Sequence, residues 1–206
     1  KAAIFPLYFW LPDSYPTAPS PVTAIFAGLL TKVGVYAVVR TQTLVFPGVL
    51  PRGLLFGVAA LTMVVGVLGA IAQEDVKRIL SFNIVGQIGY MLVGVGLFDV
   101  AGLAAVIVSL VHHIVVKTSL FLTEGLIEHH AGTSRLDHLG GLVRRAPAVA
   151  WCFGVAALAL VGIPPLSGFV SKFALFGAIA HRQEWWILAV AVVVSLLTLF
   201  SMTKIW

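Results

Sequence analysis

Charged residues are scarce in this sequence, and cysteine is nearly absent. Aspartate, glutamate, lysine and arginine make up 10% of the 206 residues, whereas water-soluble domains carry roughly 25%. This shortage excludes an ordinary water-soluble domain. The single cysteine, Cys152, excludes an internal disulfide and a multi-cysteine metal site, and we interpret it as a packing residue in an apolar run.

Motifs of soluble enzymes are missing as well. The sequence has no glycine-rich loop ending in lysine and serine or threonine, so ATP-driven transport within this chain is not expected. The neighbours His112 and His113 project in different directions from a helix, which argues against haem. We interpret His129, His130 and His138 as solvated histidines rather than as a metal site. The sequence therefore predicts no metal and no cofactor.

Long hydrophobic runs fill most of the chain instead. Hydrophobic residues make up 60% of it, the mean hydropathy is +1.05, and a membrane helix needs about 20 mostly apolar residues. We predict an all-α membrane helix bundle, a single membrane domain over residues 1–206 in contact with the lipid bilayer. Its six predicted spans are 22–40, 53–73, 76–98, 101–128, 146–181 (interrupted) and 185–206. Because the first residue is Lys1 and Trp206 ends the chain without a polar tail, we expect a C-terminal fragment of a longer membrane protein.

The basic residues predict an orientation and exclude one class of partner. They lie at helix ends or singly within helices rather than in one patch, so the net charge of +5 does not indicate nucleic-acid binding. One set of loops holds Lys77, Arg78, Arg135, Arg144, Arg145 and Lys204, and the opposite set holds Arg40, Arg52 and Arg182. The positive-inside tendency places the first set in the cytoplasm, together with the proline-rich segment 12–21, which we predict to be non-helical.

The fifth span contains an unusual break. Pro164 and Pro165 stand between Gly162 and Gly168, and Lys172 follows. We predict that residues 162–168 are non-helical inside the bilayer, where bare backbone is tolerated only if it is buried in protein or lines a water-filled cavity. Exposed carbonyls, water and a titratable lysine would suit an ion path. The alternative is a proline kink that serves packing, with Lys172 reaching toward an interface.

The fourth span carries a polar stripe. Ser109, His113, Lys117, Glu124 and Glu128 recur at helical spacing and share one face. His113 and Lys117 are one turn apart, where two cations repel each other in a medium of low dielectric, and we interpret them as a proton relay. Glu124 lies about 10 Å beyond Lys117 along the axis, within reach of a short water chain. His112 points about 100° away, and we favour a structural role for it.

Lysines recur at membrane depth, at a cost of roughly 2.5–3.5 kcal/mol for each charge at a helix centre. Lys1, Lys32, Lys117 and Lys172 lie inside or at the edge of apolar stretches, which predicts that they line a path for ions or protons. Three further polar residues share one face of the third span and either hydrate such a path or bond helices together: Asn83, Gln87 and Tyr90.

Several of these runs, taken together and in this order, resemble the antiporter-like membrane subunits of respiratory complex I and of Mrp cation/proton antiporters. The matching runs are 1–7, 10–13, 18–19 with Val22, 75–81, 87–91, 113–117 and 162–165 with Gly168, Phe169 and Lys172. Within this family, residues 14–16 joined to 24–36 make the chain most similar to the D-type subunits of the Mrp antiporters.

The resemblance implies two inverted helical repeats, each with a broken helix. By position, Lys1 matches the lysine of the first broken helix, Lys32 the lysine that connects the half-channels, Lys117 the central lysine of the second repeat and Lys172 the lysine near the exit. The glutamate partner of Lys1 would lie upstream of this chain. Many relatives have a second histidine where this chain has Ser109.

The expected function is therefore that of a membrane subunit in a hetero-oligomeric cation/proton antiporter of the bacterial plasma membrane. Protons would pass along Lys32, His113, Lys117 and Lys172 in exchange for Na⁺ or another monovalent cation. One alternative is a non-redox, proton-pumping subunit of NADH:quinone oxidoreductase, and a second is a scaffold subunit. The segment 14–36 favours the antiporter, and the buried lysines argue against a scaffold.

Overall fold

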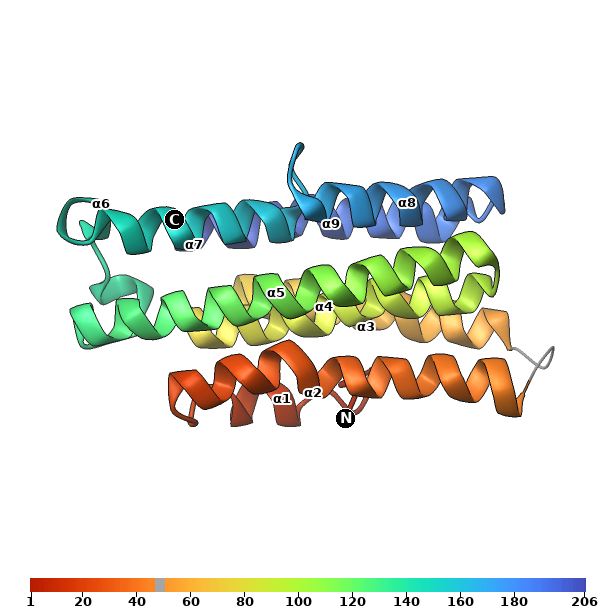
Figure 1. The fold of residues 1–206 in the computed structure, drawn as a ribbon, viewed down its shortest axis with the longest axis horizontal. Coiled ribbons are helices and arrows are strands. Elements are labelled where there is room, and N and C mark those ends of the chain that lie inside the picture. The colour runs from red at the N-terminus through yellow and green to blue at the C-terminus, as the bar shows by residue number, and fades with distance from the viewer. Residues whose placement is uncertain (47–50) are drawn as a thin grey trace.

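The chain folds into long helices that lie side by side in a bundle (Figure 1). The structure is a computed structural model and describes residues 1–46 and 51–206. Its elements are α1 (Trp10–Ser14), α2 (Ser20–Arg40) with a π-helical end (Thr41–Val45), α3 (Arg52–Ala72), α4 (Val76–Leu97), α5 (Val100–Ala131), a 3₁₀ turn (Leu136–His138), α6 (Leu142–Arg145), α7 (Pro147–Val161), α8 (Ser167–His181) and α9 (Trp185–Ile205).

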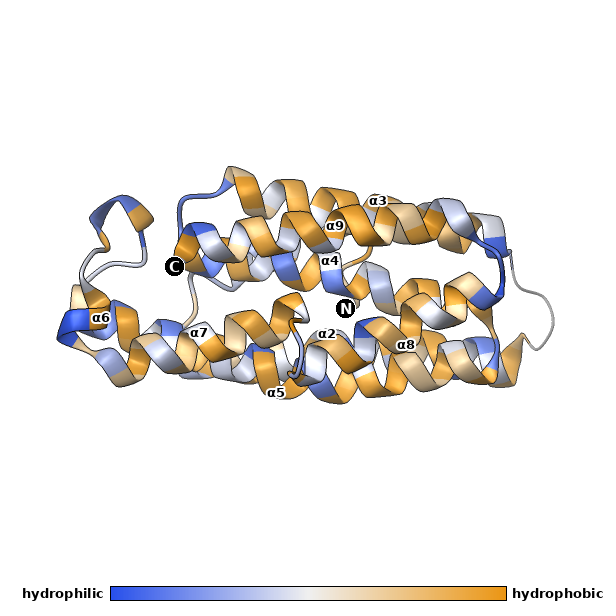
Figure 2. Cartoon of the chain, turned by 90° about the horizontal axis from the view of Figure 1, so that it is seen from above, coloured by the Kyte–Doolittle hydropathy of each residue, from blue (hydrophilic) through white to orange (hydrophobic). Residues whose placement is uncertain are grey.

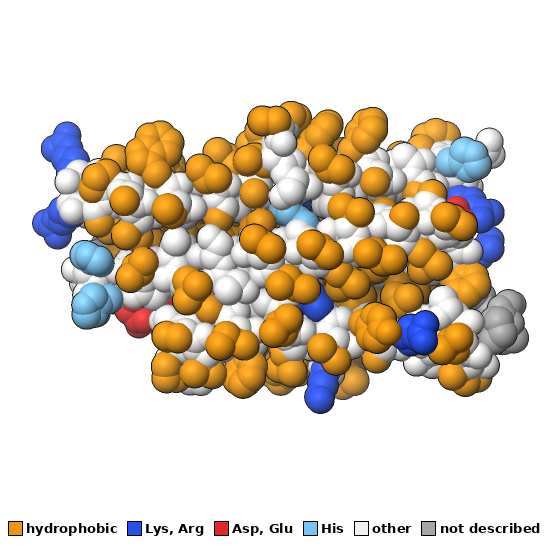
Figure 3. All heavy atoms as spheres, in the orientation of Figure 1, with side chains coloured by type: hydrophobic (Ala, Val, Ile, Leu, Met, Phe, Trp, Pro, Cys, Tyr) orange, Lys and Arg blue, Asp and Glu red, His pale blue; other side chains and the backbone are white. Residues whose placement is uncertain are grey.

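The described residues confirm the predicted all-α membrane architecture. Within these residues, five helices are long and apolar enough to cross a membrane: α2 with its π-helical end, α3, α4, α5 and α9. Hydrophobic residues make up most of the length of the helices (Figure 2), and their side chains are spread over the face of the bundle seen in Figure 3. Exposed apolar side chains run along the outer helices, among them Ile25, Leu29 and Val33 on α2. Such a surface is suited to lipid rather than to water.

The predicted break divides α7 from α8 (Figure 1). Gly162 ends α7 with a φ of +90°, a backbone conformation that glycine adopts without the penalty of a side chain. The non-helical stretch is shorter than predicted, because Ser167 and Gly168 already belong to α8. Leu166 is extended and lets the chain restart, so the interruption covers residues 162–166.

Two other sequence interpretations are wrong. The segment 12–21 is partly helical, because Pro12 lies in the first turn of α1 and Pro21 is the second residue of α2, where a missing N–H leaves no hydrogen bond unmade. Cys152 is exposed on α7 rather than packed inside.

Helix α4 is the core of the bundle and is buried along nearly its whole length. It packs closely against α3 because both helices carry glycine where they meet. A methyl group added at Gly66 would overlap the backbone nitrogen of Gly86, whereas one added at Gly86 would lie no closer than 3.6 Å to any neighbour. Gly86 therefore has room for a methyl side chain, whereas Gly66 does not.

Gly66→Ala is expected to push α3 away from α4 and to destabilise the protein by roughly 1–3 kcal/mol. Gly86→Ala, its neighbour across the same contact, should leave stability close to that of wild type. Thermal unfolding of the purified full-length protein in detergent checks this. An equal effect of the two substitutions would show that the tight α3–α4 contact does not set the difference.

The basic residues separate between the two ends of the bundle. At one end Lys204 donates to the carbonyls of Ile71 and Gln73, and Arg78 pairs with Asp13 at 2.8 Å. At the other end Arg182 pairs with Asp99 at 2.8 Å.

Asp99 also caps α5, since its Oδ1 accepts a hydrogen bond of 2.6 Å from the Gly102 N–H. Partial burial raises the pKa of this carboxyl, but its hydrogen bonds with Arg182 and Gly102 outweigh burial and hold the pKa below its usual value. The stabilisation is therefore present above the unfolded pKa of about 3.9 and is lost as the pH falls through the folded value.

Asp99→Ala is expected to lower stability by about 1 kcal/mol at neutral pH, because it removes the cap of α5. Asp99→Asn keeps an oxygen for the cap but loses the charge that Arg182 pairs with, so it should fall between wild type and alanine. Thermal midpoints of the three proteins at neutral pH and at a pH well below the unfolded value of about 3.9 check this. The gap between wild type and asparagine should narrow at the lower pH.

Candidate functional site

Three lysines from three helices are buried inside the bundle. Lys32 on α2 is 5% exposed, Lys117 on α5 is 1% exposed and Lys172 on α8 is 8% exposed. None of the salt bridges found within residues 1–46 and 51–206 involves these three side chains. An ammonium group held in a protein interior without a carboxylate is costly, which makes it a candidate for a functional group rather than for structural pairing.

Neutral oxygens receive the hydrogen bonds of these lysines. Lys32 Nζ donates to the Ala27 carbonyl within its own helix, and Lys117 Nζ lies 3.4 Å from the Leu80 carbonyl of α4. Carbonyl groups can accept from either an ammonium or a neutral amine. These contacts would therefore survive the loss of a proton by the lysine.

A small cavity of about 10 Å³ lies between α2, α4 and α5. Its polar lining consists of Lys32, Gln87, His113 and Lys117, and Ile84, Ile88 and Met91 complete it. This volume is about the smallest that can hold one water molecule. The structure thus brings Lys32, His113 and Lys117 together around one point, with Gln87, one of the three polar residues singled out on the third span, beside them.

The two histidines of α5 extend this cluster toward the broken helix. Their ring centroids are 4.8 Å apart, and His112 Nδ1 lies 2.8 Å from Ser167 Oγ in the first turn of α8. Within the described residues, His112 Nε2 and His113 Nδ1 are buried without a hydrogen-bond partner. Each ring therefore keeps one nitrogen free for a water molecule or a proton.

Lys172 lies where the break frees backbone oxygens. Its Nζ donates to the Val161 carbonyl at the end of α7, at 2.6 Å, and to Ser195 Oγ on α9, at 2.9 Å. The C-terminal end of a helix carries partial negative charge, which favours an ammonium group there. The face of Tyr90 is 5.4 Å from the same nitrogen and adds a cation–π contact.

The remaining predicted residues take other positions. Asn83 donates to the Ile79 carbonyl of its own helix and to Ser201 of α9. Tyr90 donates to the Ala191 carbonyl of α9 at 2.6 Å. Both side chains therefore connect α4 to α9. Ser109 is buried on α5, and Glu124 is buried toward the far end of that helix. Lys1 is exposed and does not line the cavity.

Sequence reasoning missed three residues that the structure places beside the predicted ones. Ser167 and Ser195 are the partners of His112 and Lys172. Lys77, which we assigned to a helix end, is buried there and pairs with Glu128 at 2.6 Å. The spacing of Lys77 with Ser81, Ile84 and Ile88 on one face of α4 is a signal that could have placed it inside.

The fold and the site together define a class: a polytopic membrane protein whose interior holds lysines and histidines beside a broken helix. The family model described as NADH:quinone oxidoreductase/Mrp antiporter, TM, matches residues 1–198, and the chain belongs to this family. This confirms the resemblance stated from the sequence motifs.

Curated relatives cover the whole chain. It is 50% identical over 208 residues to the D subunit of the Na(+)/H(+) antiporter of Alkalihalophilus pseudofirmus and 40% identical over 207 residues to the protein of the same name in Bacillus subtilis. The match takes in 100% of this chain and 42% of each relative. The chain thus spans less than half the length of these relatives.

Solved structures show the same arrangement of helices. A chain in the structure of the Mrp complex from Dietzia matches with a TM-score of 0.97 and 46% identity, over 100% of this chain and 39% of that one. A chain of respiratory complex I from Thermus thermophilus with bound NADH matches with a TM-score of 0.90 and 29% identity, over 99% of this chain and 44% of that one.

Proposed function

We propose that this chain is part of a D-type membrane subunit of a monovalent cation/proton antiporter, in which it conducts protons. It would work in a hetero-oligomeric complex of a bacterial plasma membrane, with the end that holds Lys77, Arg78 and Lys204 in the cytoplasm. The observation that carries the proposal is the cluster of Lys32, His113 and Lys117 around a cavity of about 10 Å³.

The geometry supports proton transfer in short steps. A water molecule in the cavity would touch an amine, an imidazole and a second amine, each of which can bind or release a proton. His113 and His112 then lead toward Ser167 and Lys172 at the break, where the Val161 carbonyl accepts from the ammonium group. Lys1 remains a further candidate for a relay group.

A second candidate function is proton pumping in a complex of the NADH:quinone oxidoreductase type. The similarity to a chain of respiratory complex I, with a TM-score of 0.90, favours it. The two functions differ in the source of energy, since an antiporter exchanges ions without electron transfer.

One experiment separates them. Vesicles that hold the full complex are given a pH gradient, and the collapse of that gradient is followed after addition of Na⁺ or K⁺ in the absence of NADH and quinone. Antiport predicts collapse on cation addition alone. A gradient that responds only to NADH oxidation would contradict the antiporter and support the redox-coupled pump.

A further inference from the structure

Glu124 is a buried acid that the relay described above does not use. It is 1% exposed, and within the described residues neither of its carboxyl oxygens has a hydrogen-bond partner. An unpaired carboxylate in an apolar interior costs several kcal/mol, whereas the neutral acid does not carry that cost. Burial without a hydrogen-bond partner therefore favours the neutral, protonated form of Glu124.

An ion pair lies next to this acid. The charged groups that act on Glu124 are Lys77 and Asp75 of the α4 end and Glu128, one turn further along α5. Lys77 Nζ is 2.6 Å from Glu128 Oε2, and the lysine is buried whereas the Glu128 side chain is 39% exposed. A buried acid, a buried ammonium group and a half-exposed carboxylate thus follow one another toward the end of the bundle.

The inner neighbour of Glu124 is Lys117. Seven residues of α5, about 10 Å along the axis, separate them, and no titratable side chain lies between them on that helix. Lys117 Nζ reaches the carbonyl of Leu80, which is one turn from Lys77 on the facing side of α4. Leu120 and Phe121 are fully buried between Lys117 and Glu124, so a proton needs a titratable group on the far side of this apolar layer.

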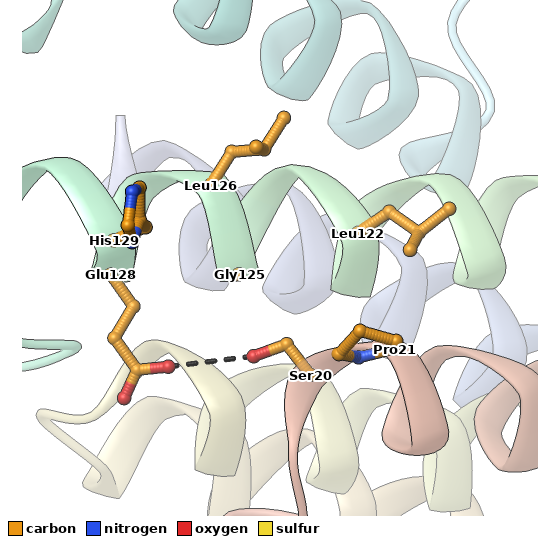
Figure 4. A pocket seen from close by; sticks show the side chains of 7 residues that line it. All are labelled: Ser20, Pro21, Leu122, Gly125, Leu126, Glu128 and His129. Carbon is orange, nitrogen blue, oxygen red and sulfur yellow. Dashed lines mark hydrogen bonds between the residues drawn. The ribbon is translucent and has the colours of Figure 1, made fainter.

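The outer neighbour, Glu128, borders an open hollow of about 670 Å³ (Figure 4). Figure 4 shows Glu128 and Ser20 pointing toward each other, and Ser20 Oγ lies 3.4 Å from Glu128 Oε2. Gly125 allows α2 to begin against α5 here, because a methyl group on it would overlap the Ser20 Cβ. Glu128 can therefore exchange protons with water at this end.

We propose that Glu124 carries the proton between Lys117 and Glu128 and so connects the buried lysines to the hollow beside Ser20. The neutral Glu124 carboxyl gives its proton to the Glu128 carboxylate, and the Lys77 ammonium group moves from Glu128 to the carboxylate left on Glu124. The summed charge of the three groups stays the same in this step. Glu128 then releases the proton to water in the hollow, the Lys117 ammonium group reprotonates Glu124 through a short water chain and becomes a neutral amine, and Lys77 returns to the Glu128 carboxylate. The same steps in reverse order carry a proton inward to Lys117. This inference rests on the proposed function, since it extends the same relay.

The ligand of this cluster is a proton rather than a metal cation. The Lys77 ammonium group repels a second cation, and hard cations need several oxygen ligands. Within residues 1–46 and 51–206, no group of three or more His, Cys, Asp or Glu side chains has the arrangement of a metal site.

The test compares Glu124→Gln, which keeps the shape but cannot titrate, with Glu124→Asp, which keeps the carboxyl. Glu74→Gln at an exposed position of the same end is the matched control. Proton flux of the full complex in vesicles should fall about tenfold or more in Glu124→Gln. Glu124→Asp should retain part of the wild-type flux, with a shifted pH profile. Glu74→Gln should transport at the wild-type rate. The infrared carbonyl band of a protonated carboxyl should disappear in Glu124→Gln alone.

The outcomes separate this inference from the proposed function. If Lys117→Arg blocks transport while Glu124→Gln transports within about twofold of wild type, Glu124 is not in the path but the relay of lysines stands. If both variants transport normally, the proposed function fails as well. Should Glu124→Gln not assemble, a wild-type rate and pH profile in Glu124→Asp would overturn the inference.

Discussion

Replacing Lys117 with arginine is expected to lower proton flux about tenfold or more, almost as far as replacement with alanine does. Arginine keeps the positive charge and most of the length, but its guanidinium group does not deprotonate in proteins. Lys117 is 1% exposed and bonds only weakly, at 3.4 Å, to the Leu80 carbonyl, so nothing near it fixes its charge. Lys117→His, which titrates, should restore part of the flux.

Vesicles with the full complex at matched expression provide the measurement for these three variants. Lys204→Arg is the control, because this exposed lysine also donates to backbone carbonyls, those of Ile71 and Gln73, but lies at the end of the bundle. Wild-type flux in Lys117→Arg would show that Lys117 is a structural cation. Size-exclusion chromatography must show assembled complex for each variant, since the larger guanidinium group occupies a fully buried site.

Lys32→Ala is expected to reduce antiport strongly, again by about tenfold or more, while the complex still assembles. Lys32 lines the cavity that also holds His113 and Lys117, and its removal takes one titratable group from that cluster. Lys32→Met should behave like alanine in transport but keep more of the packing, because methionine fills the space of the lysine stem.

The control for Lys32 is Lys204→Ala, which removes an exposed lysine from the same protein. The initial rate of pH-gradient collapse after cation addition is measured for all three substitutions. Exchange at the wild-type rate in Lys32→Ala would assign Lys32 to packing. A loss in alanine that methionine repairs would lead to the same conclusion, because only volume would then matter.

The sequence alone predicts the helices and the break because hydrophobic length and proline chemistry are local properties. Pro164 and Pro165 cannot continue a helix that is already under way, whatever surrounds them, and the spacing of His113 and Lys117 puts them on one face in any helix. The residue at which α8 begins is not determined by local sequence in the same way. Leu166 is extended and the helix begins directly after it, at Ser167. Boundaries of this kind depend on packing and differ by a few residues.

The partners of the buried groups could not be predicted from the sequence. Ser195 is 23 residues from Lys172 and Ser167 is 55 residues from His112, and only the packing of α8 and α9 against the core brings them together. Lys77 was assigned to a loop end by its charge, but the approach of α5 buries it beside Glu128. The choice between a loop and an interior position is made by tertiary contacts, which a short pattern does not contain.

The central claim is that the buried lysines act by changing protonation and not by holding charge. The most direct measurement is cation-driven proton flux by the complex in which Lys32, Lys117 and Lys172 are all replaced with arginine, compared with wild type in vesicles of equal protein content. All three charges remain and all three titrations are removed. We expect flux no higher than in vesicles without the complex. Flux within about twofold of wild type, in an assembled complex, would contradict it.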